Sequence, residues 1–273
     1  MKTRIITGIV AIALFVPICI FSETIVYPIA MSLLCAIGVF EIAKCLGYQK
    51  NLILTVPMYI IALGMPILRF FTGTNTSFMA CTTVAIFAML VYMLTYTMFR
   101  KNVDKLSDIL TFYALFFYVV GCFSSMVMVR HSTNGKYMYL LIFLGAWICD
   151  TFAYFVGKFF GKHKLIPEIS PKKTVEGSIG GIVFTIIAFV VYALIVNNAF
   201  DANLNYVKIC VLGLVLPVVS QIGDLLASTI KRQYGIKDFG FVFPGHGGVL
   251  DRFDSAMLVA PTLYVLNAFL RLI

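Results

Sequence analysis

The stretch from Ile179 to Val196 reads I-G-G-I-V-F-T-I-I-A-F-V-V-Y-A-L-I-V and contains no charged residue. An α-helix rises about 1.5 Å per residue, so about 17 to 25 apolar residues are long enough to cross the hydrocarbon of a bilayer. This stretch is therefore typical of a membrane-spanning helix.

Apolar windows of the same kind recur along the chain at residues 5–21, 25–43, 52–68, 78–99, 108–129, 137–157, 207–230 and 255–272. The chain is 61% hydrophobic and its mean hydropathy is +0.97, which excludes a water-soluble domain. We predict an all-α, polytopic integral membrane protein with about nine transmembrane helices. A cleaved signal peptide is the alternative for the first window, although no small-x-small cleavage pattern follows Phe21.

The distribution of positive charge predicts the orientation. If the N-terminus lies inside, 16 of the 21 Lys and Arg residues fall on the inner side of the membrane. Because Lys and Arg beside spans are retained in the cytoplasm, this bias predicts a cytoplasmic N-terminus. The long polar loops 158–178 and 231–254 then face the cytoplasm, and a bacterial-type inner or plasma membrane is the expected location.

Cysteine usage and net charge exclude other classes. The seven cysteines lie mainly inside predicted spans without C-x-x-C spacing, so they indicate neither a disulfide framework nor a zinc site. The formal charge of +9 is divided among membrane-flanking loops and no nucleic-acid-binding module is visible. We therefore expect anionic membrane lipid and nucleotide phosphate as partners, and no nucleic acid.

The two halves of the chain differ in polar content. Residues 1–135 are spans joined by short loops, and we predict that they form a transmembrane scaffold. Whether this scaffold also makes dimer contacts is left open. Glu41 is the only acid deep in an apolar run there; it is either a helix-end residue that reaches the cytoplasmic interface or a functional one. Residues 136–273 hold the polar clusters, and we predict a transmembrane catalytic domain.

The first cluster is D-T-F-A-Y-F-V-G-K-F-F-G-K, from Asp150 to Lys162. A carboxylate inside an apolar helix is costly, so Asp150 either has a function or forms a buried ion pair with a loop lysine. Gly157 and Gly161 are four residues apart and would let another helix or a substrate approach closely.

The second cluster is S-P-K-K-T-V-E-G, from Ser170 to Gly177. Lys172 and Lys173 are paired cations, and Thr174 with Glu176 would begin the next helix at its positive end. Such a loop is suited to phosphate oxygens; the alternative is a basic loop that only fixes topology.

The third cluster is S-T-I-K-R-Q-Y-G-I-K-D-F-G-F-V-F-P-G-H-G-G-V-L-D-R-F-D, from Ser228 to Asp254. Just before it, Asp224 is spaced to share a helix face with Ser228 and Lys231, and Asp251 lies three residues before Asp254. Carboxylates from different helices supply the hard oxygen ligands that Mg²⁺ prefers, and Asp224 and Asp251 are the first candidates.

Other residues of the third cluster suit a phosphate-rich substrate. The cations can stabilise negative charge that develops on phosphorus; they are Lys231, Arg232, Lys237 and Arg252. Asp238 is placed to orient Lys237. The glycines at 245, 247 and 248 permit a tight turn that presents amide groups to an anion. His246 lies within that turn. A lone histidine more often forms structural hydrogen bonds than acts as an acid or base.

At these motifs the chain resembles the phosphatidate cytidylyltransferases, also called CDP-diacylglycerol synthases. Their signature is S-x-apolar-K-R, four residues, K-D, then P-x-H-G-G and D-R-x-D, and Ser228–Asp254 is similar to it throughout. The elements at Asp150–Lys162 and Ser170–Gly177 also resemble family elements. The likeness covers about 105 residues of the C-terminal half, and the N-terminal spans offer no motif to compare.

The resemblance implies transfer of a cytidylyl group from CTP to phosphatidic acid, which gives CDP-diacylglycerol and pyrophosphate. It implies Mg²⁺ bound by Asp224, Asp251 and Asp254 and leaves open a second cation such as K⁺. The glycine-bearing spans, apart from the resemblance, leave open a homodimer. The expected catalytic residues are Asp224, Lys231, Arg232, Asp251, Arg252 and Asp254. The expected substrate-binding residues are Asp150, Ser170, Lys172, Lys173, Thr174, Ser228, Lys237, Asp238, His246, Gly247 and Gly248.

Two other functions remain alternatives at this point. A CTP-dependent lipid-alcohol kinase also uses CTP at a membrane, but it releases CDP instead of pyrophosphate. A secondary transporter is suggested by Asp150 and Asp224 among the spans. A transporter needs polar groups that reach both faces, whereas here they gather on one.

Overall fold

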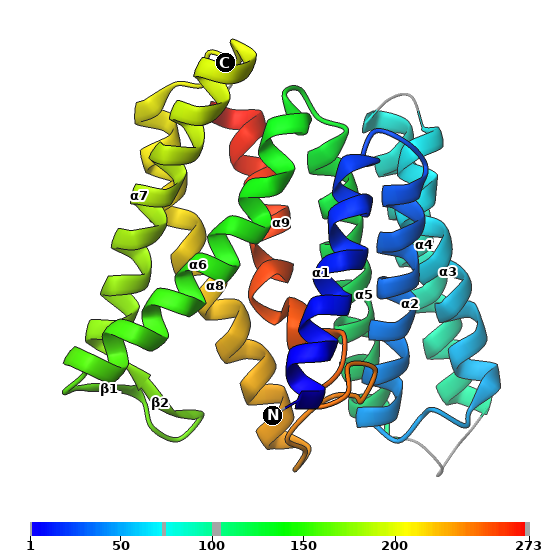
Figure 1. The fold of residues 1–273 in the computed structure, drawn as a ribbon. Helices are drawn as coiled ribbons and strands as arrows, with labels where there is room; N and C mark the ends of the chain where they lie inside the picture. The colour runs from blue at the N-terminus through cyan, green and yellow to red at the C-terminus, as the bar shows by residue number, and fades with distance from the viewer. Residues whose placement is uncertain (1, 73–74, 100–104, 271–273) are drawn as a thin grey trace. The chain divides into compact units, whose positions relative to one another are not determined.

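The computed structural model describes residues 2–72, 75–99 and 105–270. Figure 1 shows their helices and one antiparallel hairpin of two short strands. The elements in chain order are α1 (Lys2–Ile20), α2 (Val26–Cys45), α3 (Leu52–Phe71), α4 (Asn75–Phe99), α5 (Leu106–Arg130), α6 (Gly135–Phe160), β1 (Lys164–Ile166), β2 (Ser170–Thr174), α7 (Val175–Phe200), α8 (Tyr206–Gln233) and α9 (Leu250–Leu270).

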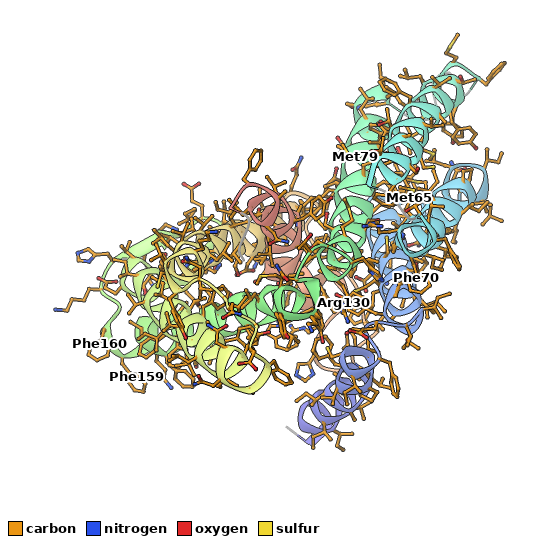
Figure 2. The ribbon with its side chains drawn as sticks, turned by 90° about the horizontal axis from the view of Figure 1, so that it is seen from above. Met65, Phe70, Met79, Arg130, Phe159 and Phe160 are labelled. Atoms are coloured by element: carbon orange, nitrogen blue, oxygen red, sulfur yellow. The ribbon has the colours of Figure 1, made fainter. Side chains whose placement is uncertain are left out.

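The helices confirm the all-α polytopic membrane fold. Each predicted window coincides with one helix to within a few residues. Within the described ranges, α2 to α8 are long and apolar enough to cross a membrane, and the apolar part of α1, Ile6–Ile20, is shorter. Large apolar side chains such as Phe159 and Phe160 point outward (Figure 2), as expected for a surface that meets lipid.

The number of nine spans and their orientation remain predictions. Some of the charges on which the orientation rests lie outside the described residues: Arg100, Lys101, Arg271 and the side chains of Lys2 and Arg4. The end of the last predicted window, beyond residue 270, lies outside them too.

The chain divides into two compact units, and the first combines residues 1–128 with residues 236–252. Within it α2 packs against α1 and α3, and α3 against α4. The ring of Tyr48 stacks on Phe112 of α5 at 5.4 Å between centroids. Gly38 of α2 lies against Val119 of α5 and Leu250, which a side chain at Gly38 would meet at 3.0 to 3.1 Å. The segment 236–252 therefore packs with the N-terminal helices.

The second unit combines residues 129–235 with residues 253–273. Its α6, α7 and α8 pack against one another. Small residues allow the close approach of α6 and α7, because a Cβ at Gly177 would lie 2.5 Å from the carbonyl oxygen of Ala153. A Cβ at Gly157 would lie 2.7 Å from the hydroxyl of Thr174 and 3.6 Å from Gly177, which confirms the predicted close approach at Gly157.

The predicted loop 158–178 contains the hairpin, in which Lys164 lies opposite Thr174 and Ile166 opposite Ser170. Thr174 ends β2 and caps α7, because its hydroxyl accepts a hydrogen bond from the Gly177 amide at 3.1 Å. The prediction that a helix begins at this threonine is confirmed. In the second predicted loop α8 continues to Gln233 and α9 begins at Leu250, so the irregular part is shorter than expected.

Candidate active site

A cavity of about 440 Å³ lies in the second unit, within the usual size range of small-molecule pockets. It is formed by α6, the hairpin, α7 and α8. Five of the predicted site residues line it: Asp150, Lys172, Lys173, Thr174 and Asp224. Lys158 and Lys164 add two further cations to its wall. The cavity is thus rich in positive charge and suits a polyanion.

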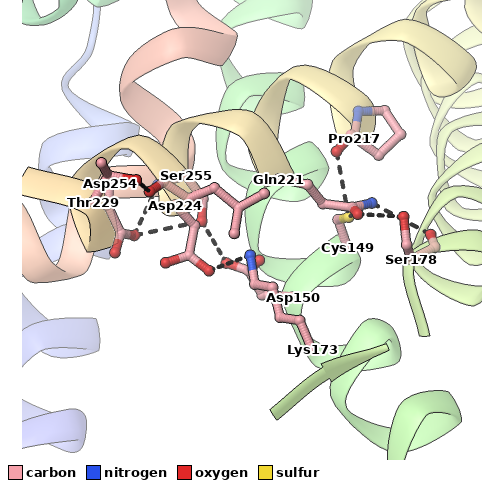
Figure 3. Close-up of polar contacts among 11 residues, drawn as sticks. Cys149, Asp150, Lys173, Ser178, Pro217, Gln221, Asp224, Thr229, Asp254 and Ser255 are labelled. Atoms are coloured by element: carbon pink, nitrogen blue, oxygen red, sulfur yellow. Dashed lines mark hydrogen bonds and ion pairs between the residues drawn. The ribbon is translucent and has the colours of Figure 1, made fainter. Parts of the chain in front are cut away.

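An ion pair joins the hairpin to α8 at this cavity. The ammonium nitrogen of Lys173 lies 2.5 Å from Oδ2 of Asp224, and each side chain is about a quarter exposed, 23% and 25% respectively (Figure 3). Such a pair ties β2 to α8, nine residues before the helix ends at Gln233. A loop lysine is thus paired with Asp224.

A second polar connection joins α6 to α9. The hydroxyl of Ser255 donates to Oδ2 of Asp150 at 2.7 Å, and the Ser255 amide donates to Oδ1 of Asp254 at 2.8 Å (Figure 3). Asp254 also lies within electrostatic reach of Asp224, Asp150 and Lys231. Three carboxylates from α6, α8 and α9 thus lie near one another, an arrangement that favours bound cations.

A third cluster was not predicted from the sequence. The Ser178 hydroxyl donates to Oε1 of Gln221 at 2.5 Å, and Nε2 of Gln221 donates to the Ser178 carbonyl at 3.3 Å and to Sγ of Cys149 at 3.4 Å (Figure 3). Ser178 and Gln221 line the cavity. The only sequence signal was Gln221, a polar side chain inside the apolar window 207–230, because Ser178 falls at the end of the predicted loop 158–178.

The remaining predicted residues of this unit lie away from the wall of the cavity. Ser170 begins β2, and Ser228, Lys231 and Arg232 occupy the last turns of α8. Within the described residues, neither these four nor Asp254 line the cavity. The helix face that Asp224 shares with Ser228 and Lys231 is continuous in α8, as predicted.

The other predicted residues belong to the first unit, around the turn between α8 and α9. Gly245 and Gly247 adopt positive φ angles of 77° and 89°, and the Phe243 amide donates to the Gly247 carbonyl at 3.0 Å. The predicted tight turn is confirmed. His246 lies half-buried in it, and its amide donates to the Phe243 carbonyl at 2.8 Å. Lys237, Asp238 and Arg252 are exposed.

Backbone amides in and beside this turn donate hydrogen bonds to the carboxylate of Asp251. Asp251 is 6% exposed, and its Oδ2 accepts hydrogen bonds from the amides of Phe239 at 2.8 Å and Gly248 at 2.9 Å. The Gly248 amide, predicted to face an anion, therefore faces Asp251. One oxygen of this carboxylate is engaged in holding the turn.

In the part of the chain that the structure describes, no group of three or more His, Cys, Asp or Glu side chains is arranged to hold a metal ion by itself. Mg²⁺ commonly takes only one or two carboxylates and completes its coordination with substrate phosphates and water. Asp224 and Asp254 provide hard oxygen donors of this type near each other in the second unit. These residues fit a site of that kind, and the assignment of Asp224, Asp251 and Asp254 as ligands stays a prediction.

Comparisons with known proteins identify relatives along the whole chain. The sequence model of the Cytidylyltransferase family matches residues 2–270. The phosphatidate cytidylyltransferase of Bacillus subtilis is 36% identical over 275 residues, which covers 98% of each chain. Those of Staphylococcus haemolyticus and Staphylococcus aureus are each 35% identical over 266 residues, 97% of this chain and 98% of theirs.

Proposed function

The chain belongs to the cytidylyltransferase family, and from this membership we propose how its residues perform the reaction. The chain is a nucleotidyltransferase that converts CTP and phosphatidate to CDP-diacylglycerol in phospholipid biosynthesis. The observation that carries our proposal is the lysine-lined cavity with the Lys173–Asp224 ion pair at its wall. We assign this cavity to the triphosphate of CTP.

Two features of the cavity support this assignment. Lys158, Lys164, Lys172 and Lys173 line it, and a triphosphate carries enough negative charge to match them. The N-terminus of α7, capped by Thr174, adds the positive end of a helix dipole. Because lysine side chains are flexible, their ammonium groups can stay close to the phosphate oxygens as negative charge shifts toward the leaving pyrophosphate.

The reaction is an in-line displacement at the α-phosphorus of CTP. A phosphate oxygen of phosphatidate forms a bond to that phosphorus as the bond to the β-phosphate oxygen breaks, and pyrophosphate leaves. A phosphomonoester is largely ionised near neutral pH, so no strong general base is required. The chain then has to hold the two substrates in line and stabilise the negative charge of the transition state.

The acids and cations of the predicted motifs divide these tasks. Asp224, Asp251 and Asp254 are the proposed ligands of Mg²⁺, which when bound would offset the charge of the triphosphate. Lys231, Arg232, Lys237 and Arg252 are proposed to stabilise charge on the phosphates. Ser255 supports the arrangement by joining Asp150 to Asp254. A second cation such as K⁺ and a homodimer remain further expectations.

We also propose that the cavity opens to the cytoplasm, in a bacterial inner or plasma membrane. CTP is a cytoplasmic substrate, and most Lys and Arg residues fall on the same side of the membrane as loops 158–178 and 231–254. A cytoplasmic cavity would receive CTP directly while phosphatidate enters from the inner leaflet.

The proposed function is tested by product analysis. Purified protein in detergent micelles is incubated with labelled CTP, phosphatidate and Mg²⁺, and the lipids are extracted. Label in CDP-diacylglycerol with release of pyrophosphate is the expected result. Release of CDP with a newly phosphorylated lipid would instead identify a CTP-dependent kinase, and solute flux in proteoliposomes without CTP would indicate a transporter.

A further inference from the structure

Glu41 is a buried acid in α2, and it lies outside every motif considered above. Its side chain is 1% exposed, one turn before the end of the helix. Oε1 accepts a hydrogen bond from the Val249 amide at 2.8 Å, and Oε2 accepts one from the Leu250 amide at 2.9 Å. All three residues belong to the first unit. An acid from α2 thus binds a segment more than 200 residues later in the chain.

The two amides stand at the start of α9, which begins at Leu250. The first amides of a helix have no partner within the helix, and a carboxylate there also interacts favourably with the helix dipole. Next to them, Asp251 accepts from the amides of Phe239 and Gly248. Two buried carboxylates therefore hold four backbone amides at both ends of the turn 239–250.

The glycines around Glu41 are required by the carboxylate itself. A Cβ at Gly240 would lie 2.2 Å from Oε1 of Glu41, and a Cβ at Gly248 would lie at the same distance. Any side chain at either position would displace the carboxylate or the turn. The glycines and the acid thus form one arrangement, in which the backbone closes around Glu41.

The arrangement demands a carboxylate rather than any polar group. Both oxygens of Glu41 accept hydrogen bonds, whereas a glutamine has one acceptor and would set its NH₂ group against a backbone N–H. A charged group inside a span is expensive and usually has a functional reason. The segment that Glu41 holds carries Asp251 and Arg252, both assigned to the reaction.

We propose that Glu41 is a positioning residue for cytidylyl transfer: its carboxylate fixes the turn 239–250 and the first turn of α9, and so sets the position of Asp251. Glu41 does not contact the substrate. The inference rests on the proposed function, since it concerns how that site is held. It gives the N-terminal helices a role in catalysis through one side chain.

The test compares Glu41→Gln and Gly240→Ala with the wild type. Small misplacement of reacting groups lowers turnover on the order of 100-fold. We expect kcat for CDP-diacylglycerol formation to fall by about this factor in both variants, with the KM for CTP changed less than about threefold, because the lysine cavity of the other unit is untouched. Amide exchange of Val249 and Leu250 should become faster in Glu41→Gln.

Met31→Ala is the matched control, because Met31 is a 1% exposed residue of α2 almost three turns from Glu41. It should lower the melting temperature by opening a cavity and leave kcat unchanged. Wild-type kcat in Glu41→Gln, or a similar loss in Met31→Ala, overturns the proposal. If Glu41→Gln does not fold, Gly240→Ala decides in the same way. A wild-type protein that forms no CDP-diacylglycerol instead rejects the proposed function, and this inference with it.

Discussion

The ammonium nitrogen of Lys173 lies 2.5 Å from Oδ2 of Asp224, so a strand of the hairpin and helix α8 meet in an ion pair at the wall of the cavity. The lysine belongs to the S-P-K-K-T motif and the aspartate precedes the S-T-I-K-R motif. Two residues that are 51 positions apart in the sequence (224 − 173) therefore meet at one place. A cation and a proposed metal ligand lie side by side there.

Lys173→Met should weaken the interaction with CTP. Hydrogen bonds to charged groups contribute about 1.5 to 3 kcal/mol, and about 1.4 kcal/mol corresponds to a factor of ten. We expect kcat/KM for CTP to fall about 10- to 100-fold, measured from initial rates at saturating phosphatidate. Lys136→Met removes the same charge from an exposed position at the start of α6 and should change nothing. Equal kinetics in both variants would remove Lys173 from the site.

Asp224→Asn and Asp251→Asn should differ in stability although both lose nearly all turnover. Asp224 is about a quarter exposed at the cavity, so its replacement should lower the melting temperature less than the replacement of Asp251 does. Asp251 is buried and its Oδ2 accepts two backbone hydrogen bonds. Asn can keep both bonds with its single oxygen but loses the negative charge that strengthens them, so its melting temperature should fall. Thermal unfolding in detergent and rates under Mg²⁺ saturation test this. An active Asp224→Asn variant would contradict the proposed metal site.

Much of the fold could be predicted from the sequence because spans are local features. The length and apolarity of a stretch are enough to predict a helix such as α7. The start of α7 could also be predicted, because the side chain of Thr174 caps the helix that follows it directly in the sequence. The position of Asp150 in an apolar run indicated either a function or a buried ion pair, and Asp150 lines the cavity.

Other features could not be predicted because they depend on contacts between distant elements. Ser178 and Gln221 pair across 43 residues. In the sequence Ser178 falls at the end of a predicted polar loop, and Gln221 looks like an isolated polar residue in a span. The partners of Glu41 are the backbone amides of Val249 and Leu250. Almost every residue type has such an amide, so the sequence does not indicate this contact. The sequence left the role of Glu41 open for that reason.

The orientation of the hairpin can be tested with the wild-type protein. Lys162 lies exposed in the connection between α6 and β1, and trypsin cleaves after lysine. If this segment faces the cytoplasm, inverted membrane vesicles treated with trypsin should yield a new N-terminus at His163. Right-side-out vesicles should remain uncut there. The opposite pattern, read by mass spectrometry of the fragments, would reverse the proposed topology.

Gly180→Ala should destabilise the second unit, whereas Gly121→Ala should not destabilise the protein. A Cβ at Gly180 of α7 would lie 2.6 to 2.7 Å from the side chain of Val156 on α6, so the two helices must separate. Overpacking of this kind costs about 1 to 3 kcal/mol. Gly121 of α5 has no atom within 4 Å of an added Cβ, and alanine favours a helix over glycine by about 1 kcal/mol. Thermal unfolding in detergent should show a lower melting temperature for Gly180→Ala and an unchanged or higher one for Gly121→Ala. Equal melting temperatures would mean that α6 and α7 are not held at the distance that shapes the cavity.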